Sequence, residues 1–354
     1  MSAWQYVRDY GRRHLMKIGA ASAVAGLPAM SEAAAAAPKI ALEEHFSTPE
    51  FEQRGLVARP ARLNPMFADT ARRLVDLGDL RLEAMDAAGI DLSVLSLTVP
   101  GIQGEKEQGT AVRLAQQVND FLAREVQKRP QRYGGFAAVP MQDPLAAADE
   151  LQRAVKDLGF RGALINGQTN GQYLDDAKFL PFWERVQELD VPVYLHPGIL
   201  ADSPAMFAGR PELAGPVWGW AADTGAHALR LIFSGLFKRF PRLKVILGHM
   251  GEGLPFLLWR VDNRHEFMVG RPLVPEERPS FFFRRNFVIT TSGVCDPHAL
   301  AASLATLGDD NVMFSVDYPY QDSKQAGDFI ERAPLGDAVR AKVCNANAKL
   351  VLRL

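Results

Sequence analysis

Cysteine, long apolar runs and an excess of charge of either sign are all scarce in this sequence. Its two cysteines, Cys295 and Cys344, are far apart, which argues against a disulfide framework and a cysteine-based metal site. No apolar run approaches the roughly 18 residues that a membrane-spanning helix needs. The 40 Lys and Arg residues against 41 Asp and Glu residues leave a net charge of −1. That balance argues against a surface for nucleic acid or an anionic membrane.

The first 37 residues have the composition of an export signal rather than of a folded domain. Arg12 and Arg13 precede a weakly apolar stretch at residues 18–27, and alanines fill residues 33–37. A charged start, a short apolar segment and small residues form the layout of secretory signals, and paired arginines are typical of the twin-arginine type. We therefore predict a leader over residues 1–37, with export to the periplasm, and one folded domain over residues 38–354. If the paired arginines are accidental, the protein is cytoplasmic.

The rest of the chain is rich in short apolar segments. Hydrophobic residues make up 47% of the sequence, which is enough for a large core. Eight of the apolar segments alternate with stretches of helical periodicity, so we interpret them as strands. The predicted strands cover residues 40–42, 90–98, 135–139, 163–165, 191–197, 245–249, 287–291 and 312–317.

Apolar strands that alternate with helices indicate a parallel sheet that is covered on both faces. Eight such repeats in about 300 residues suit an α/β fold with a single (β/α)8 TIM barrel and loop insertions. A doubly wound sheet is the alternative, but it needs a glycine-rich loop after the first strand. Residues 42–45 read Leu-Glu-Glu-His, so the sequence favours the barrel.

Polar side chains occur at the C-terminal ends of several predicted strands. Glu43 and His45 follow the first strand, His196 ends the fifth, His249 ends the sixth and Asp317 ends the eighth. Alternation along an extended chain points Glu43 and His45 to the same side. Barrels place their chemistry at these strand ends, and carboxylates and imidazoles are ligands of divalent transition metals. Each residue alone could be an ordinary surface residue, but together they predict a metal site.

Four stretches give the sequence a resemblance to a known family: ALEEHF (41–46), HPG (196–198), HALRLIFSGLFKRFPRLKVILGHMGE (227–252) and SVDYPY (315–320). They resemble the amidohydrolase superfamily, and more narrowly its metal-dependent non-oxidative decarboxylases, typified by γ-resorcylate and 2,3-dihydroxybenzoate decarboxylases. The resemblance implies a homo-oligomer, either a dimer or a tetramer. It also implies metal ligation by Glu43, His45, His196 and Asp317. His249, with Glu252 beside it, is implied to contact substrate and Asp317 rather than necessarily to bind the metal.

The resemblance also implies a single divalent ion, with zinc expected first and manganese second. Two-metal members of the superfamily use two histidines on the first strand and a modified lysine on the fourth. Here the first strand supplies Glu43 instead, and the fourth strand, within RGALING (161–167), has no lysine. One ion with open positions is a catalytic arrangement.

From this resemblance we expect a carboxy-lyase acting on an ortho-hydroxybenzoate-type aromatic acid. Asp317 would donate a proton to the ring carbon that bears the carboxylate, and carbon dioxide would leave. His249 would orient Asp317, with Glu252 orienting His249 in turn. Phe46 would contact the substrate, because it follows His45 directly.

A hydrolase of an ester, lactone or amide is the alternative function. In that case the ion would activate water and Asp317 would act as general base. The ligand set does not separate the two reactions, because both use one ion and one acid–base carboxylate. Outside the site, we expect His227 to be a packing residue on a helix.

Overall fold

Strands and helices alternate from Lys39 to the C-terminal region, as the sequence predicts. The structure is a computed structural model that describes residues 38–53, 65–200 and 205–354. The predicted leader, residues 1–37, lies outside this described part. No helix within the described ranges has the length and apolarity needed to cross a membrane.

All the strands pair in parallel. Only Phe136 separates β3 from β4, and its N–H donates to the Leu95 carbonyl at 2.9 Å, so the two segments form one interrupted strand. The strands are β1 (Lys39–Phe46), β2 (Ile90–Leu97), β3 (Tyr133–Gly135), β4 (Ala137–Ala138), β5 (Ala163–Asn166), β6 (Val193–His196), β7 (Val245–Leu247), β8 (Phe287–Thr290) and β9 (Val312–Met313).

The chain after β9 returns to β1 and closes the sheet. The Asp317 N–H donates to the Glu43 carbonyl at 2.9 Å, and the His45 N–H donates to the Tyr318 carbonyl at 2.7 Å. Glu44 and Tyr318 form a parallel bridge between these hydrogen bonds. The sheet is therefore a closed ring of eight parallel strands, which confirms the predicted (β/α)8 barrel and rules out an open, doubly wound sheet.

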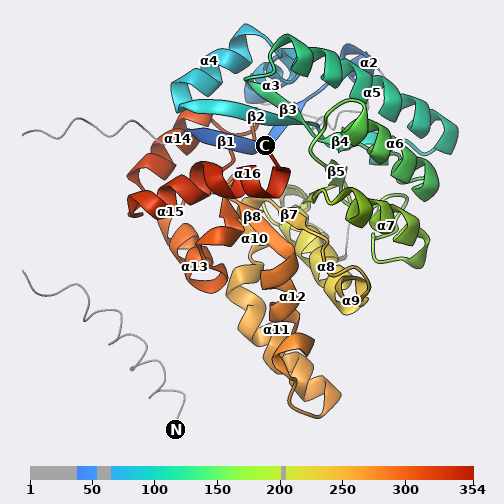
Figure 1. The fold of residues 1–354 in the computed structure, drawn as a ribbon, viewed down its shortest axis with the longest axis vertical. Coiled ribbons are helices and arrows are strands. Elements are labelled where there is room, and N and C mark those ends of the chain that lie inside the picture. The colour runs from blue at the N-terminus through green and yellow to red at the C-terminus, as the bar shows by residue number, and fades with distance from the viewer. Residues whose placement is uncertain (1–37, 54–64, 201–204) are drawn as a thin grey trace, which may run out of the picture. The chain divides into compact units, whose positions relative to one another are not determined.

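Helices surround this ring, and α11 and α12 extend away from it (Figure 1). Aspartates cap several of the helices: the Asp296 carboxylate accepts from the His298 and Ala299 N–H groups, at 2.7 and 3.0 Å, ahead of Pro297. The helices are α2 (Pro49–Gln53), α3 (Pro65–Val75), α4 (Asp79–Ala88), α5 (Gln108–Lys128), α6 (Pro144–Lys156), α7 (Leu180–Leu189), α8 (Gly219–Phe233), α9 (Leu236–Arg239), α10 (His249–Glu252), α11 (Leu254–Val269), α12 (Pro279–Asn286), α13 (Pro297–Leu307), α14 (Ser323–Arg332), α15 (Asp337–Ala341) and α16 (Asn347–Leu352).

The hydrophobic core has two layers, one on each face of the strands. The larger layer lies between strands and helices. The smaller one fills the barrel interior, with contributions from every strand, and Ala348 and Leu352 of α16 pack against it. The interior side chains from the strands are Ile40, Leu42, Val94, Phe136, Leu164, Tyr194, Ile246, Val288 and Met313.

The barrel interior changes from apolar to polar over one step of strand alternation. Residues two positions apart on a strand face the same side, so each apolar interior residue is followed by a second interior residue nearer the C-terminal end. These second residues are mostly polar and include Ser96, Asn166, His196, Thr290 and Ser315. The apolar layer thus forms the floor of a polar chamber.

A β-bulge in β1 brings both Leu42 and Glu43 to the interior. The pairing of β1 with β2 shifts register between Ala41 and Glu44. The Ser315 hydroxyl oxygen accepts from both the Leu42 and Glu43 N–H groups, at 3.0 and 2.6 Å, because the extra residue leaves these donors without a strand partner. Regular alternation resumes after Glu43, so His45 faces inward with it.

Candidate metal centre

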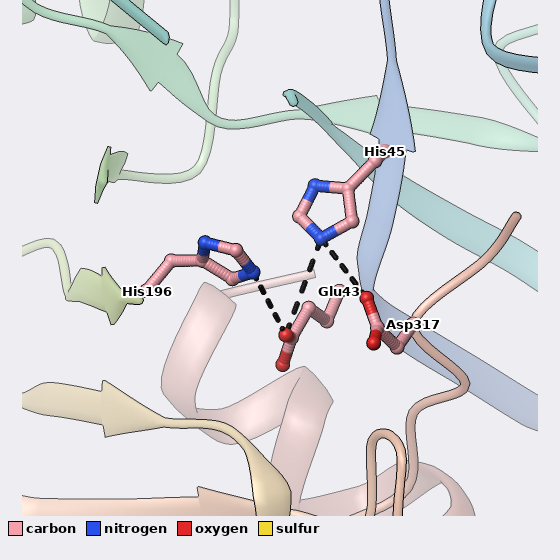
Figure 2. A group of neighbouring side chains, drawn as sticks. All are labelled: Glu43, His45, His196 and Asp317. Carbon is pink, nitrogen blue, oxygen red and sulfur yellow. Dashed lines mark ion pairs between the residues drawn. The ribbon is translucent and has the colours of Figure 1, made fainter. Parts of the chain in front are cut away.

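Four side chains converge in the polar chamber (Figure 2). Oε1 of Glu43 lies 3.2 Å from Nε2 of His196 and 4.0 Å from Nε2 of His45. Nε2 of His45 lies 3.2 Å from Oδ1 of Asp317. One ligand-type atom from each residue falls within 4.8 Å of the others. Residues from β1, β6 and the segment after β9 therefore meet at one point, as the strand-end pattern predicted.

The donor atoms at this point fit one divalent cation. Oε1 of Glu43 and Nε2 of His45 are buried and have no hydrogen-bond partner among the described residues. Unpaired buried polar atoms are costly unless a ligand satisfies them. Two imidazole nitrogens with two carboxylate oxygens form a donor set for divalent transition metals. The residues present therefore match the implied ion.

Hydrogen bonds on the far side of each imidazole aim Nε2 at the cluster. Nδ1 of His196 lies 2.9 Å from Oδ1 of Asn166 and 2.8 Å from the Pro197 carbonyl oxygen. A carbonyl oxygen only accepts, so Nδ1 carries the proton and Nε2 presents its lone pair. Nδ1 of His45 lies 3.3 Å from the Ser96 hydroxyl, and this contact leaves Nε2 of the ring on the side of the cluster.

Glu43 is held from behind by two hydroxyl groups. Its Oε2 accepts hydrogen bonds from Tyr194 and Ser292, while Oε1 faces the histidines. Burial raises the pKa of Glu43, but the charge of His249 and the contact with His196 outweigh burial and hold the pKa well below its usual range. The carboxylate is therefore present as the anion that cation binding requires.

His249 and Glu252 stand beside the four ligand-type residues. Nδ1 of His249 lies 2.8 Å from Oε1 of Glu252, and Nε2 lies 3.7 Å from Oδ2 of Asp317. Burial lowers the pKa of His249, but the charges of Glu43 and Glu252 outweigh burial and raise the pKa well above its ordinary value. The predicted chain of contacts from Glu252 through His249 to Asp317 is present.

His249 lies in a left-handed turn rather than at the strand end that the sequence suggested, and Glu252 belongs to the same turn. β7 ends at Leu247, and φ is 49° at His249, 54° at Met250 and 55° at Glu252. Such conformations are costly for residues with side chains and persist where the surroundings require them. Gly293 makes room beside this turn, since a Cβ there would lie 2.9 Å from Cδ2 of His249.

The predicted substrate contact of Phe46 is wrong. Its ring is fully buried and stacks on Phe121 of α5, with 6.1 Å between ring centroids. Alternation explains this position: His45 faces the interior, so Phe46 must face the helix layer.

The sequence did not predict several residues that support the cluster. Ser96 and Asn166 support the imidazoles, and Tyr194 and Ser292 support Glu43. Part of the signal was available: Tyr194 precedes His196 by two residues, the spacing that puts two side chains on one face of a strand. The others lie on strands, or beyond strands, to which the sequence assigned no ligand.

Comparison with known proteins agrees with this geometry. The amidohydrolase family model matches residues 20–354. The γ-resorcylate decarboxylase of Rhizobium sp. (strain MTP-10005) is 43% identical over 324 residues, covering 89% of this chain and 98% of the relative.

Two solved structures are also similar. A 2,6-dihydroxybenzoate decarboxylase complexed with 2,6-dihydroxybenzoate has a TM-score of 0.84 at 42% identity, covering 90% of this chain and 100% of the other. A dihydroxybenzoic acid decarboxylase from Polaromonas sp. JS666, with bound manganese and the inhibitor 2-nitroresorcinol, has a TM-score of 0.82 at 41% identity, covering 90% and 97%. The family match spans most of the chain and confirms the resemblance read from the motifs: this protein belongs to the amidohydrolase family.

Proposed function

We propose that this protein is a metal-dependent, non-oxidative decarboxylase of an ortho-hydroxybenzoate-type acid. The observation that carries the proposal is the position of Asp317, whose carboxylate lies beside both His45 and His249 and is 14% exposed. A carboxylate at the edge of a cation site can both support the ion and exchange a proton with a bound molecule. Relatives that cover most of the chain are decarboxylases of dihydroxybenzoates, which supports the same reaction.

One divalent ion would be held by Glu43, His45, His196 and Asp317. When bound, such an ion would fix the phenolic and carboxylate oxygens of the substrate and stabilise negative charge on them. The mixed nitrogen and oxygen donors suit zinc and manganese alike. The manganese in the Polaromonas relative supports manganese, and metal analysis of the purified protein would decide between the two.

The protein's own residues would carry the proton. Asp317 would donate it to the ring carbon that bears the carboxylate, the bond from that carbon to the carboxylate would break, and the electron pair would restore aromaticity as carbon dioxide leaves. His249 would hold Oδ2 of Asp317 in place from 3.7 Å. Glu252, 2.8 Å from the other nitrogen, would keep the His249 ring oriented.

The test is an assay of metal-loaded protein on two substrate panels. Salicylate-type acids are followed for carbon dioxide release, and esters and lactones are followed for hydrolysis. We expect release of carbon dioxide from at least one acid with a hydroxyl group ortho to the carboxylate, and none after the metal is chelated. Hydrolysis without decarboxylation would reject this function in favour of the hydrolase alternative.

We also propose that the protein is a homo-oligomer, a dimer or a tetramer, that associates through α11. Four large apolar side chains of this helix are 61–79% exposed: Phe256, Trp259, Phe267 and Met268. Exposed apolar surface of this kind marks contact sites, and α11 extends away from the barrel (Figure 1). Light scattering should give a multiple of the chain mass, and Trp259→Glu should lower it. A monomeric wild type would contradict the proposal.

We further propose that residues 1–37 are a twin-arginine-type leader that directs export to the periplasm. The support is the paired arginines and the alanine-rich end of the segment. Replacing Arg12 and Arg13 with lysine should keep the protein in the cytoplasm with its N-terminal residues attached, which fractionation and mass spectrometry would detect. Equal distribution of the wild type and this variant would contradict it.

A further inference from the structure

The two oxygens of the Glu43 carboxylate face different surroundings. Oε1 faces the cluster, 3.2 Å from Nε2 of His196 and 3.4 Å from Nε2 of His249, and accepts no hydrogen bond from the described residues. Oε2 accepts hydrogen bonds from the hydroxyls of Tyr194, on β6, and Ser292, just beyond β8. One oxygen is thus left to the site and the other is held by the protein.

The direction of these hydrogen bonds follows from the number of protons available. An ionised carboxylate only accepts, so Tyr194 and Ser292 must each give it their single proton. The Thr290 hydroxyl then has one proton for either the Tyr194 oxygen at 2.8 Å or the Ser292 oxygen at 3.0 Å, and Ser292 also accepts from the backbone N–H of His249 at 3.1 Å. Both hydroxyl groups are fully buried, and each lies between the Glu43 carboxylate and a second polar group. Oε2 is therefore held in place by residues that lie outside β1.

The space around Oε2 is also filled. A side chain at Gly248 would overlap this oxygen and would lie 3.0 Å from the Ser292 hydroxyl oxygen. Glycine at this position lets the carboxylate sit deep between Tyr194 and Ser292. Turning Oε2 toward the cluster would break two buried hydrogen bonds and leave both hydroxyls without their acceptor, which is costly for buried polar groups.

We propose that Tyr194 and Ser292 are positioning residues that restrict Glu43 to one ligating oxygen and so keep a coordination position of the ion open for substrate. The inference rests on the proposed function. A carboxylate can ligate a cation through one oxygen or through both. With Glu43, His45, His196 and Asp317 each giving one atom, an octahedral ion keeps two open positions, which a phenolic oxygen and a carboxylate oxygen can share. A second oxygen from Glu43 would take one of them.

The test is the manganese-loaded Tyr194→Phe/Ser292→Ala double variant. Its readouts are manganese per chain, the dissociation constant of 2-nitrophenol, which presents two neighbouring oxygens, and the Glu43 oxygen–manganese distances in a crystal structure. We expect one manganese per chain, both Glu43 oxygens on the ion, and 2-nitrophenol binding weakened about 10- to 100-fold. Unchanged affinity with a single ligating oxygen would overturn the inference.

A matched control removes the same atoms elsewhere in the barrel. The Tyr133 hydroxyl donates to the Leu77 carbonyl at 3.0 Å, and the Ser93 hydroxyl is buried without a partner among the described residues. Tyr133→Phe/Ser93→Ala should leave 2-nitrophenol affinity and Glu43 geometry unchanged. If the test variant does not fold, Tyr194→Phe and Ser292→Ala are measured singly, and wild-type values in both overturn the inference.

These readouts separate the inference from the proposed function, because neither metal coordination nor 2-nitrophenol binding requires turnover. A wild-type protein that releases no carbon dioxide would contradict the function and leave the coordination measurement valid. A wild-type decarboxylase whose double variant matches it in both readouts would contradict only the role of Tyr194 and Ser292.

Discussion

Buried and half-buried imidazoles occur in two settings in the described part of the chain. At the mouth of the barrel, His45, His196 and His249 face the carboxylates of Glu43 and Asp317 at 3.2–4.0 Å. These acidic neighbours stabilise positive charge at that position, whether it is carried by an imidazolium or by a bound cation.

His227 in α8 is as fully buried as His45 but has different neighbours. Its Nε2 accepts from the Leu174 N–H at 2.9 Å, and its ring packs edge-on against Tyr173. Burial, reinforced by the charge of Arg230, lowers the pKa of His227 to about 3, so the ring stays neutral. The comparison teaches that burial alone does not identify an imidazole with a chemical role, whereas carboxylates facing it do. This matches the expectation that His227 is a packing residue.

The change with the largest expected effect removes the acid from the barrel mouth. Asp317→Asn should lower kcat about 1,000-fold or more, because an amide cannot donate the proton to the ring carbon. Metal content should remain near one ion per chain, since three other ligands persist. Carbon dioxide release and metal analysis measure the two effects, and full activity in this variant would exclude Asp317 as the proton donor.

The next change weakens the β1 bulge that positions Glu43 and leaves α8, which carries His227, unchanged. Ser315→Ala leaves the Leu42 and Glu43 N–H groups without their acceptor, which should lower the free energy of unfolding by about 2–4 kcal/mol. Metal affinity should fall as well, because Glu43 sits on the bulge. Ser303→Ala, at a buried hydroxyl without a partner in the described residues, is the control. Equal behaviour of the two variants, by denaturant unfolding and metal titration, would contradict the prediction.

A subtler change makes His249 resemble His227. Glu252→Gln removes the charge that faces Nδ1 of His249 at 2.8 Å, so kcat should fall about 10- to 100-fold while KM changes little. Glu150, a buried glutamate that pairs with Arg153 at 2.8 Å on α6, gives the matched control Glu150→Gln. Steady-state kinetics should separate the two variants, and a loss confined to KM would show that Glu252 acts on binding instead.

The smallest change concerns acid stability. The pKa of His227 is about 3 in the fold, against an ordinary value of about 6.5, so between these values the unfolded chain binds more protons and stability falls as pH falls. Because of His227, the free energy of unfolding should fall by about 1–2 kcal/mol between pH 7 and pH 5. His227→Gln keeps an acceptor but does not titrate, so its loss over that range, measured by urea unfolding, should be smaller by this amount. If the free energy of unfolding of wild type and variant changes equally with pH, the lowered pKa of His227 is contradicted.

The sequence predicted the barrel and the four ligand-type residues for the same physical reason. Apolar strand segments are short and distinct, and the residues that end them share one rim of a closed parallel sheet. Glu43, His45, His196 and Asp317 could therefore be placed together without any knowledge of their distances. The error over Phe46 was avoidable, since the alternation that pairs Glu43 with His45 already assigns the next residue to the opposite face.

Other features depend on partners that are distant in the sequence. The bulge at Leu42 and Glu43 requires the hydroxyl of Ser315, and the hold on Glu43 requires Tyr194 and Ser292. The left-handed turn at His249 depends on packing around Gly293. Local sequence preferences do not indicate these contacts, because they form between residues that come together only when the barrel closes.

The bulge in β1 has a consequence for how much chemistry one strand can supply. A regular strand sends every second side chain inward, so a segment that begins with Ile40 and Leu42 on the apolar floor would next present Glu44 to the chamber. The extra residue adds an inward position without lengthening the barrel, so β1 completes the floor and still delivers a carboxylate and an imidazole. Glu44 therefore faces away from the chamber but stays buried. It lies where β1 meets the segment after β9, and its Oε1 accepts from the Val316 N–H at 3.1 Å. One extra residue thus lets a single strand both pack the barrel floor and supply two ligand-type side chains.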